Sequence, residues 1–471
     1  MKKPLNKDFV LILFIFITSR IIFSFFGIRL DYENLYDYWQ YLDVETLRHN
    51  LLRGVWFDHT QPPFFNLLLG TILKLGGNYS LLIFSLFFKV ITITNTLLLL
   101  DILKKVLPGS RIPIILSLIY LLSPATIVFE NELFYTGFIT MLFLISCRYL
   151  LLLQTSESWL KILGFFIPLV IICLTRSMYH LAWLIAMSMI VIYMLWKHPK
   201  RIRFISAASL AIILVSGFYL KNYIIFHKFS TSSWAGMNLA RNVFHDAGSL
   251  PENNIGSIPP FSPIEQYSSF IKKNDTITFK GLNDKDLLSL RKNDSIINEK
   301  HISYIEVSEK YLDAGIQYIK THPSHYLKNV FQSAISFFAP ATRYTVTSKQ
   351  TEKIKYYDLL YSFNISHFVN GKQQRRISLV ITAIPKLLLY CFVFFWLIKG
   401  WLKRKQIDLI NLFITCLIGY VFIVSSLMEH YENMRFRYEI EPLFLILLGQ
   451  LIYSISKNNR LKMKLLNPKQ L

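Results

Sequence analysis

Apolar residues in this chain are gathered into blocks about 20 residues long, separated by basic or polar stretches. A helix rises about 1.5 Å per residue, so about 20 apolar residues cross the roughly 30 Å of hydrocarbon in a bilayer. Hydrophobic residues make up 53% of the sequence and charged residues only 17%, a composition that excludes an ordinary soluble globular domain. The blocks therefore predict an all-α, multi-pass membrane protein.

We expect a bundle of about ten transmembrane helices, the first of them an uncleaved anchor. The predicted spans lie near residues 8–28, 80–103, 112–128, 133–153, 159–175, 178–196, 204–226, 378–398, 408–427 and 437–456. A further apolar stretch, residues 59–75, is too short to span the bilayer comfortably, and we expect it to form an interfacial helix.

The positions of the basic residues predict the orientation of the chain. Clusters at residues 2–7, 104–111, 197–203, 399–405 and 457–464 all fall on one side of the predicted spans. The positive-inside rule makes that side cytoplasmic and places both termini there. The net charge of +22 thus reflects membrane topology, and we expect no nucleic-acid partner. The expected location is the plasma membrane, or the inner membrane of a bacterium.

This orientation divides the chain into three parts. Residues 1–226 form a transmembrane core with a first outer loop at 29–79, residues 227–377 form a small α-containing outer domain, and residues 378–471 form the last helices and a basic cytoplasmic tail. Because the remaining polar segments all lie on the outer face, we expect the functional site there.

The first outer loop, residues 30–43, is rich in both carboxylates and aromatic residues. Aromatic faces pack on the apolar side of sugar rings and carboxylates accept hydroxyl protons, although the same aromatics could form an interfacial belt. Asp31 follows the first span directly, where partial desolvation would favour a role as a general base.

Several short motifs on the predicted outer face resemble those of one enzyme family. They are Asp31-Tyr-Glu33, the His-x-Gln-Pro-Pro element at 59–63, and the segments 129–136, 175–180, 232–241 and 432–442. In this order they resemble the GT-C superfamily of integral membrane glycosyltransferases, in particular the protein O-mannosyltransferase and aminoarabinose transferase group. The family motif has adjacent Asp-Glu, so either Asp31 or Glu33 could be the base here.

The resemblance implies a GT-C-like fold and an inverting glycosyltransferase, of hexosyl or pentosyl type. Such an enzyme moves a sugar from a polyprenyl-phosphate donor to a lipid, glycan or protein acceptor on the outer face of the membrane. Asp31 and Glu33 are the catalytic candidates. The substrate-binding candidates are His59, Gln61, Lys89, Glu130, Glu132, Arg176, Trp234, Asn238, Arg435 and Arg437.

The arginine candidates suit a departing phosphate, because guanidinium groups bind phosphate oxygens in a bidentate manner. We expect Arg435 and Arg437 to be exposed near the interface and to contribute little to folding. Lys89 falls inside a predicted span, where a charge is costly and indicates a partner. His59 is expected to orient Asp31 or the acceptor.

The sequence requires no cofactor. Glu130, Glu132, His59 and Asp31 are residue types that could surround Mg²⁺ or Mn²⁺, but no spacing among them is diagnostic of a metal site. Two other functional classes fit part of the pattern: a lipid-linked glycan polymerase or ligase, and a transporter or flippase for lipid-linked or anionic substrates. Transporters usually carry polar groups near the middle of the membrane, whereas the acids here gather at one interface.

Overall fold

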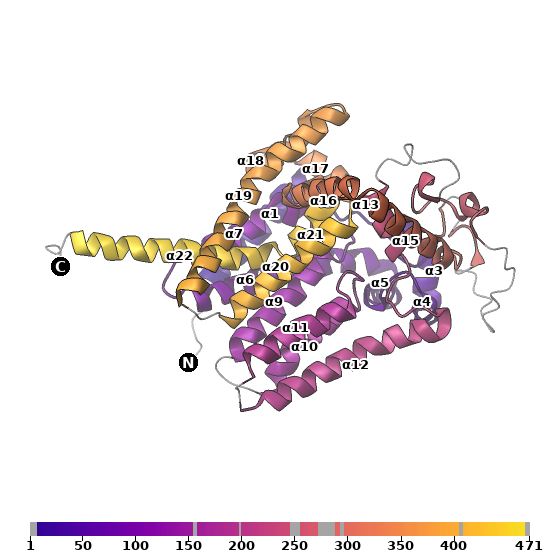
Figure 1. The fold of residues 1–471 in the computed structure, drawn as a ribbon. Coiled ribbons are helices and arrows are strands. Elements are labelled where there is room, and N and C mark those ends of the chain that lie inside the picture. Colours follow the sequence, from indigo (N-terminus) through magenta and orange to yellow (C-terminus); the bar gives the residue numbers. More distant parts are fainter. Residues whose placement is uncertain are drawn as a thin grey trace.

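The chain forms an all-helical structure in the computed structural model, which describes residues 7–153, 158–196, 199–244, 255–271, 288–292, 296–404 and 408–466 (Figure 1). No β-strand occurs within these ranges, only two isolated bridges, one of them joining Asp31 to Glu132. This architecture confirms the all-α prediction.

The N-terminal helices follow the apolar blocks of the sequence. They are α1 (Lys7–Phe25), α2 (Asn34–Asp37), α3 (Val44–His49), α4 (Leu51–Phe57), α5 (Pro63–Gly76), α6 (Ser80–Val106), α7 (Ile112–Leu122), α8 (Pro124–Phe129), α9 (Thr136–Leu153), α10 (Trp159–Cys173), α11 (Leu181–Met194) and α12 (Arg201–Phe226). Helices α5 and α8 each begin with a proline, which lacks an N–H and has its φ preset for the first helical turn.

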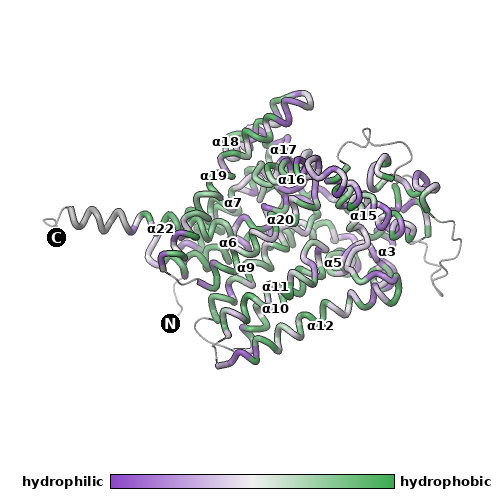
Figure 2. The backbone as a smooth tube through the Cα atoms, in the orientation of Figure 1, coloured by the Kyte–Doolittle hydropathy of each residue, from purple (hydrophilic) through white to green (hydrophobic). Residues whose placement is uncertain are grey.

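The C-terminal half starts with shorter, more polar helices. Its elements are α13 (Ala235–Val243), α15 (Tyr304–Thr321), α16 (Pro323–Phe338), α17 (Ser348–Lys353), α18 (Lys355–Ser362), α19 (Lys372–Arg404), α20 (Leu409–Met428), α21 (Asn433–Glu439) and α22 (Glu441–Leu466). In Figure 2 the helical bundle is mostly hydrophobic, and hydrophilic segments gather around α15 and α3.

Six helical stretches in the described ranges are long and apolar enough to cross a membrane. They are Lys7–Phe25, Pro63–Val106, Thr136–Leu153, Arg201–Phe226, Gln373–Lys403 and Leu409–Met428. Helices α21 and α22, bent by 63°, make a seventh if they form one span. The other three predicted spans correspond to apolar helices α7, α10 and α11, which have 10–17 residues, so the number ten stays a prediction.

The segment between α12 and α19 contains a second hydrophobic core, separate from that of the bundle. Trp234, Met237, Tyr267 and Tyr311 belong to this core, which joins α13 to α15. The two helices touch backbone to backbone at Gly236, where an added Cβ would lie 1.8 Å from the Ser308 carbonyl oxygen. Helix α16 instead packs on α19, α20 and α21. The outer location of this segment and the proposed domain boundaries stay predictions.

Candidate functional site

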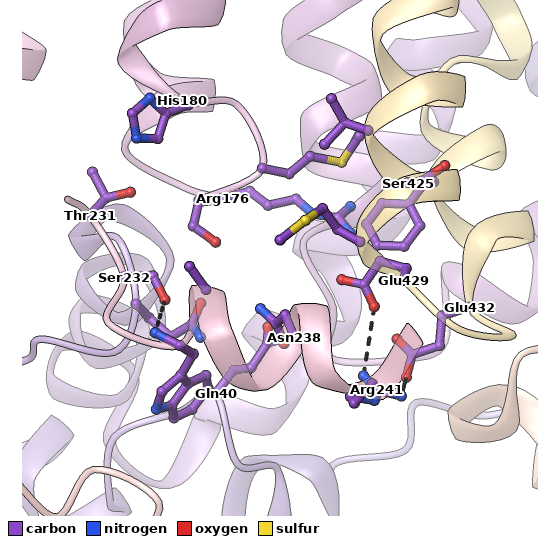
Figure 3. Close-up of a pocket in the computed structure, with 18 of the residues that line it drawn as sticks. Gln40, Arg176, His180, Thr231, Ser232, Asn238, Arg241, Ser425, Glu429 and Glu432 are labelled. Atoms are coloured by element: carbon purple, nitrogen blue, oxygen red, sulfur yellow. Dashed lines mark hydrogen bonds and ion pairs between the residues drawn. The ribbon is translucent and has the colours of Figure 1, made fainter. Parts of the chain in front are cut away.

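A cavity of about 260 Å³ lies between α13, the end of α20 and the loop that follows α10 (Figure 3). We call it the α13 cavity. Its lining includes five of the substrate-binding candidates identified from the sequence: Gln61, Arg176, Trp234, Asn238 and Arg435. These residues are separated by up to several hundred positions in the chain, and the fold brings them to one place.

One wall of the α13 cavity is aromatic. The rings of Trp39 and Trp234 stack with centroids 5.1 Å apart and an interplanar angle of 16°. Phe261 meets both indoles edge-on and holds the pair in place. Trp234 is only 1% exposed, so the partly buried Trp39 provides the indole surface of this wall. Its ordering costs little side-chain entropy, because an indole has only two rotatable angles.

Ion pairs account for the charges around this cavity. Arg241 lies 2.7 Å from Glu432 and 3.6 Å from Glu429. Arg435 lies 2.9 Å from the same Glu432 and donates a hydrogen bond to the Tyr344 hydroxyl at 3.1 Å. Arg176 pairs with Glu439, which also accepts a hydrogen bond of 2.7 Å from the Tyr179 hydroxyl. Each guanidinium is thus compensated by a carboxylate.

Other polar groups of the α13 cavity have no partner within the described ranges. The side-chain amides of Asn238 and Gln61 make no hydrogen bond there, and Asn238 points toward the open space in Figure 3. Glu429 points into the same space and forms an ion pair of 3.6 Å with Arg241, and its Oε2 accepts no hydrogen bond from a described residue. Burial, together with the negative charge of Glu432, raises the pKa of Glu429 above its ordinary value. These groups are available to a ligand.

The expectation that Arg435 and Arg437 are exposed is wrong. Their side chains are only 2% and 1% exposed. Arg437 pairs with Glu441 and donates hydrogen bonds to the carbonyl oxygens of Phe337 and Ala339, and it does not line the α13 cavity. The error has a physical reason: the sequence places both arginines near a span end, but α16 packs over α21 and covers them.

The two predicted catalytic acids have different surroundings. The Asp31 backbone N–H donates to the Asn131 carbonyl oxygen at 2.8 Å, which places Asp31 beside the buried Glu132. Burial and the charge of Asp31 raise the pKa of Glu132 to about 9. Glu33 instead has its side chain 62% exposed and pairs with Lys349. The structure therefore distinguishes Asp31, half of a carboxyl pair, from Glu33, an exposed surface acid.

A second cavity, of about 370 Å³, lies between the end of α1 and the start of α6. We call it the α6 cavity. Its cations are Arg20, Arg29 and Lys89, and its single carboxylate is Glu130. Arg20 binds Glu130 through a bidentate contact with distances of 2.7 to 3.1 Å, so these two charges cancel.

Lys89 and Arg29 supply the remaining charge of the α6 cavity. The Lys89 ammonium donates to the Ser85 hydroxyl at 2.6 Å, and within the described part of the chain neither cation has a carboxylate partner. Leu82, on the rim, is 57% exposed and belongs to an apolar face of α6 that includes Leu86 and Val90. The cavity thus joins two uncompensated positive charges to a surface suited to lipid.

One short segment, residues 130–135, connects the linings of the two cavities. Glu130 and Asn131 line the α6 cavity, and Tyr135 lines the α13 cavity. Consecutive Cα atoms are at most about 3.8 Å apart, so Asn131 and Tyr135 lie within about 15 Å of each other. Glu132, with Asp31 beside it, falls inside this interval.

His59 lies away from the acid pair, and both of its ring nitrogens are engaged. The Ser233 hydroxyl lies 2.7 Å from Nδ1, and the Lys300 carbonyl oxygen lies 3.0 Å from Nε2. Because a carbonyl only accepts, Nε2 carries the proton and Nδ1 accepts from Ser233. Burial lowers the pKa of His59 to about 4. His59 thus connects the loop before α5 to Ser233 and Lys300, which lie between α12 and α19. Its role toward Asp31 stays a prediction.

The described residues contain no group of three or more His, Cys, Asp or Glu side chains arranged to hold a metal ion. Glu130 is occupied by Arg20 and His59 by Ser233 and Lys300, so two of the metal-ligand candidates already have partners.

Sequence reasoning missed several lining residues. Trp39 and Arg241 lie within or beside motifs that were identified, but nothing in the sequence shows that Trp39 stacks on Trp234. Glu429 directly follows α20, and Arg20 lies within α1. A signal for Arg20 existed, because a charge inside an apolar span requires a partner.

No protein-family model, curated protein or solved structure matches this chain.

Proposed function

We propose that the chain is an inverting membrane glycosyltransferase that takes a sugar from a polyprenyl-phosphate donor and passes it to an acceptor on the outer face of the membrane. The observation that carries this proposal is the Asp31–Glu132 pair beside the α6 cavity. The buried Glu132, whose pKa is raised, lies beside Asp31 and close to two cations that have no carboxylate partner among the described residues. An exposed apolar face of α6 borders the same cavity.

The α6 cavity suits a lipid-linked phosphate. Lys89 and Arg29 would hold the phosphate oxygens, and the Ser85 hydroxyl adds a hydrogen-bond donor. The polyprenyl chain would follow the exposed apolar face of α6 at Leu82, Leu86 and Val90, where a long hydrocarbon remains in contact with lipid. A soluble nucleotide-sugar donor has no need of such a surface.

A neutral Glu132 beside Asp31 suits an inverting displacement. With its pKa near 9, Glu132 stays protonated at neutral pH, so we assign the role of the base to Asp31. Asp31 accepts the proton of the acceptor hydroxyl while the oxygen of that hydroxyl forms a bond to the anomeric carbon. The bond from that carbon to the phosphate oxygen breaks, and the polyprenyl phosphate leaves with the electron pair, stabilised by Lys89 and Arg29.

The Asp31 carboxylate is positioned by its own loop. Its Oδ1 accepts a hydrogen bond of 2.9 Å from the Glu33 backbone N–H, and no other hydrogen bond to this carboxylate occurs within the described ranges. Oδ2 therefore stays available for a proton. Glu132 is fixed by a hydrogen bond of 3.1 Å from the Asn34 side-chain amide to its Oε2.

A donor panel tests the proposal. The purified protein is incubated with radiolabelled polyprenyl-phosphate sugars, and cleavage of the sugar–phosphate bond is measured alongside retention of the lipid. Wild type should cleave one donor, and Lys89→Met should weaken its binding by about tenfold or more, because a charged hydrogen bond is lost. Lys74→Met is the matched control, since Lys74 is exposed on α5 and lines neither cavity.

Two results would contradict the proposal. Movement of an intact lipid-linked substrate across a proteoliposome membrane without bond cleavage would identify a transporter. Equal donor affinity in Lys89→Met and Lys74→Met would remove the phosphate from the α6 cavity.

A further inference from the structure

We propose that the α13 cavity is a subsite for one neutral sugar ring. This inference rests on the proposed function, because it assigns part of the same reaction's substrates to a second cavity. The ring belongs either to the acceptor glycan or to the donor's own sugar, and the two sources share one chemistry.

The aromatic wall supplies the first argument. Trp39 and Tyr420 are partly exposed aromatic residues of the lining, and the buried Trp234 supports Trp39 by stacking on it with centroids 5.1 Å apart. One face of a pyranose ring carries only C–H groups, and such a face packs on an indole or phenyl ring with little loss of hydration. A ligand without an apolar face gains nothing from this wall.

The unpaired polar groups supply the second argument. Asn238 and Gln61 each present an amide, which has both donors and an acceptor, and neither amide hydrogen-bonds to another described residue. Glu429 adds an acceptor on the same side as Asn238 (Figure 3). Sugar hydroxyls donate and accept at once, so they can satisfy amides and a carboxyl together.

The charge balance decides between neutral and anionic ligands. Arg176, Arg241 and Arg435 are each paired with a glutamate, and breaking a buried pair to bind an anion would leave a carboxylate uncompensated. The α6 cavity differs, because Lys89 and Arg29 there have no carboxylate partner in the described chain. The proposed phosphate site thus carries cations without a carboxylate partner in the described chain, whereas the arginines at the proposed sugar site are paired.

The distance between the sites fits one reaction. Glu132 lies within the few residues that separate the linings of the two cavities, and Asp31 is bridged to it. A sugar ring in the α13 cavity and a phosphate in the α6 cavity would each lie on one side of Asp31.

Binding of sugars without donor tests the inference directly. Saturation-transfer NMR is recorded on the full-length protein in detergent with methyl α- and β-glycosides of glucose, galactose and mannose, with glucuronate, and with inorganic phosphate. We expect at least one neutral glycoside to bind more tightly than glucuronate and phosphate. Asn238→Leu and Gln61→Leu should each weaken that binding by about tenfold, because each removes a hydrogen-bonding amide.

Asn78→Leu is the matched control, because Asn78 is exposed in the turn before α6 and lines neither cavity. The cavity variants should keep the thermal unfolding temperature of wild type, since neither amide bonds to a described residue. A competition arm separates the sources: a glycoside that displaces the polyprenyl-phosphate donor occupies the place of the donor's sugar, and one that binds alongside it occupies the place of the acceptor.

Three outcomes would overturn the inference: no glycoside binds, only glucuronate or phosphate binds, or binding survives unchanged in both cavity variants. The donor-cleavage assay separates these failures from a failure of the proposed function. A protein that cleaves a donor but binds no free sugar keeps the function and loses the subsite.

Discussion

Replacing Glu132 with glutamine should abolish one specific component of the pH dependence of stability. Glu132 is buried with 0% exposure, and its pKa is raised from 4.5 to about 9 in the folded chain. Between these values the unfolded chain releases a proton that the folded chain retains, so stability is greatest below pH 4.5 and falls as pH rises toward 9. The slope reaches about 1.4 kcal/mol per pH unit.

Between pH 6 and 8 the titration of Glu132 should lower the free energy of unfolding of wild type by about 3 kcal/mol. In Glu132→Gln this decrease should be absent. The unfolding entropy is roughly 2 cal/mol/K per residue, and the chain has 471 residues. The unfolding temperature of wild type should therefore fall by about 3 °C relative to that of Glu132→Gln over this pH range. The assay is thermal unfolding in detergent at half-unit pH steps, followed by tryptophan fluorescence.

Two further variants make the test specific. Asp31→Asn removes a neighbouring charge that helps to raise the Glu132 pKa, so the fall in stability should end at a lower pH than in wild type. Glu33→Gln alters an acid that is 62% exposed and contributes less than Asp31 to the raised Glu132 pKa, so its effect on the pH dependence should be smaller than that of Asp31→Asn. Parallel curves for wild type and Glu132→Gln across this pH range would refute the reasoning and the assignment of Glu132 as a neutral acid.

Three other predictions concern packing, charge and topology. Gly236→Ala should lower the unfolding temperature by several degrees, because the added Cβ would overlap the Ser308 carbonyl oxygen. Gly217→Ala is the control: an added Cβ there meets no atom within 4 Å, so the unfolding temperature should stay the same or rise. Arg435→Ala should destabilise by about 3–5 kcal/mol in denaturant unfolding, since it breaks a buried pair; a loss of donor binding with unchanged stability would contradict this. A reporter fused near residue 253 should report the outer compartment and one after residue 405 the cytoplasm, and finding both on one side would refute the orientation.

The helices could be predicted well because apolar blocks are a local signal. All ten predicted spans coincide with helices, yet α7, α10 and α11 are shorter than the sequence suggested. The breaks come from the chain itself: α7 ends at Leu122, where Pro124 begins a new helix, and a residue before proline is pushed out of the helical region.

The site was only partly predictable. Motif order indicated Gln61, Arg176 and Asn238, and the fold gathers them in one cavity. Long-range pairing was not predictable, because the contact of Arg20 with Glu130 joins positions 110 residues apart. Burial of arginines at a span end likewise depends on which distant helix packs over them, and the sequence carries no local signal for that.

Single-turnover cleavage of a bound polyprenyl-phosphate sugar by Asp31→Asn tests the central claim most directly. The amide is nearly isosteric with the carboxylate but accepts no proton, and loss of general-base help costs typically 100- to 10,000-fold in rate. The account predicts a folded protein that binds the donor with wild-type affinity and transfers its sugar at least about 100-fold more slowly, while Glu33→Gln retains most activity. Wild-type turnover in Asp31→Asn would contradict it.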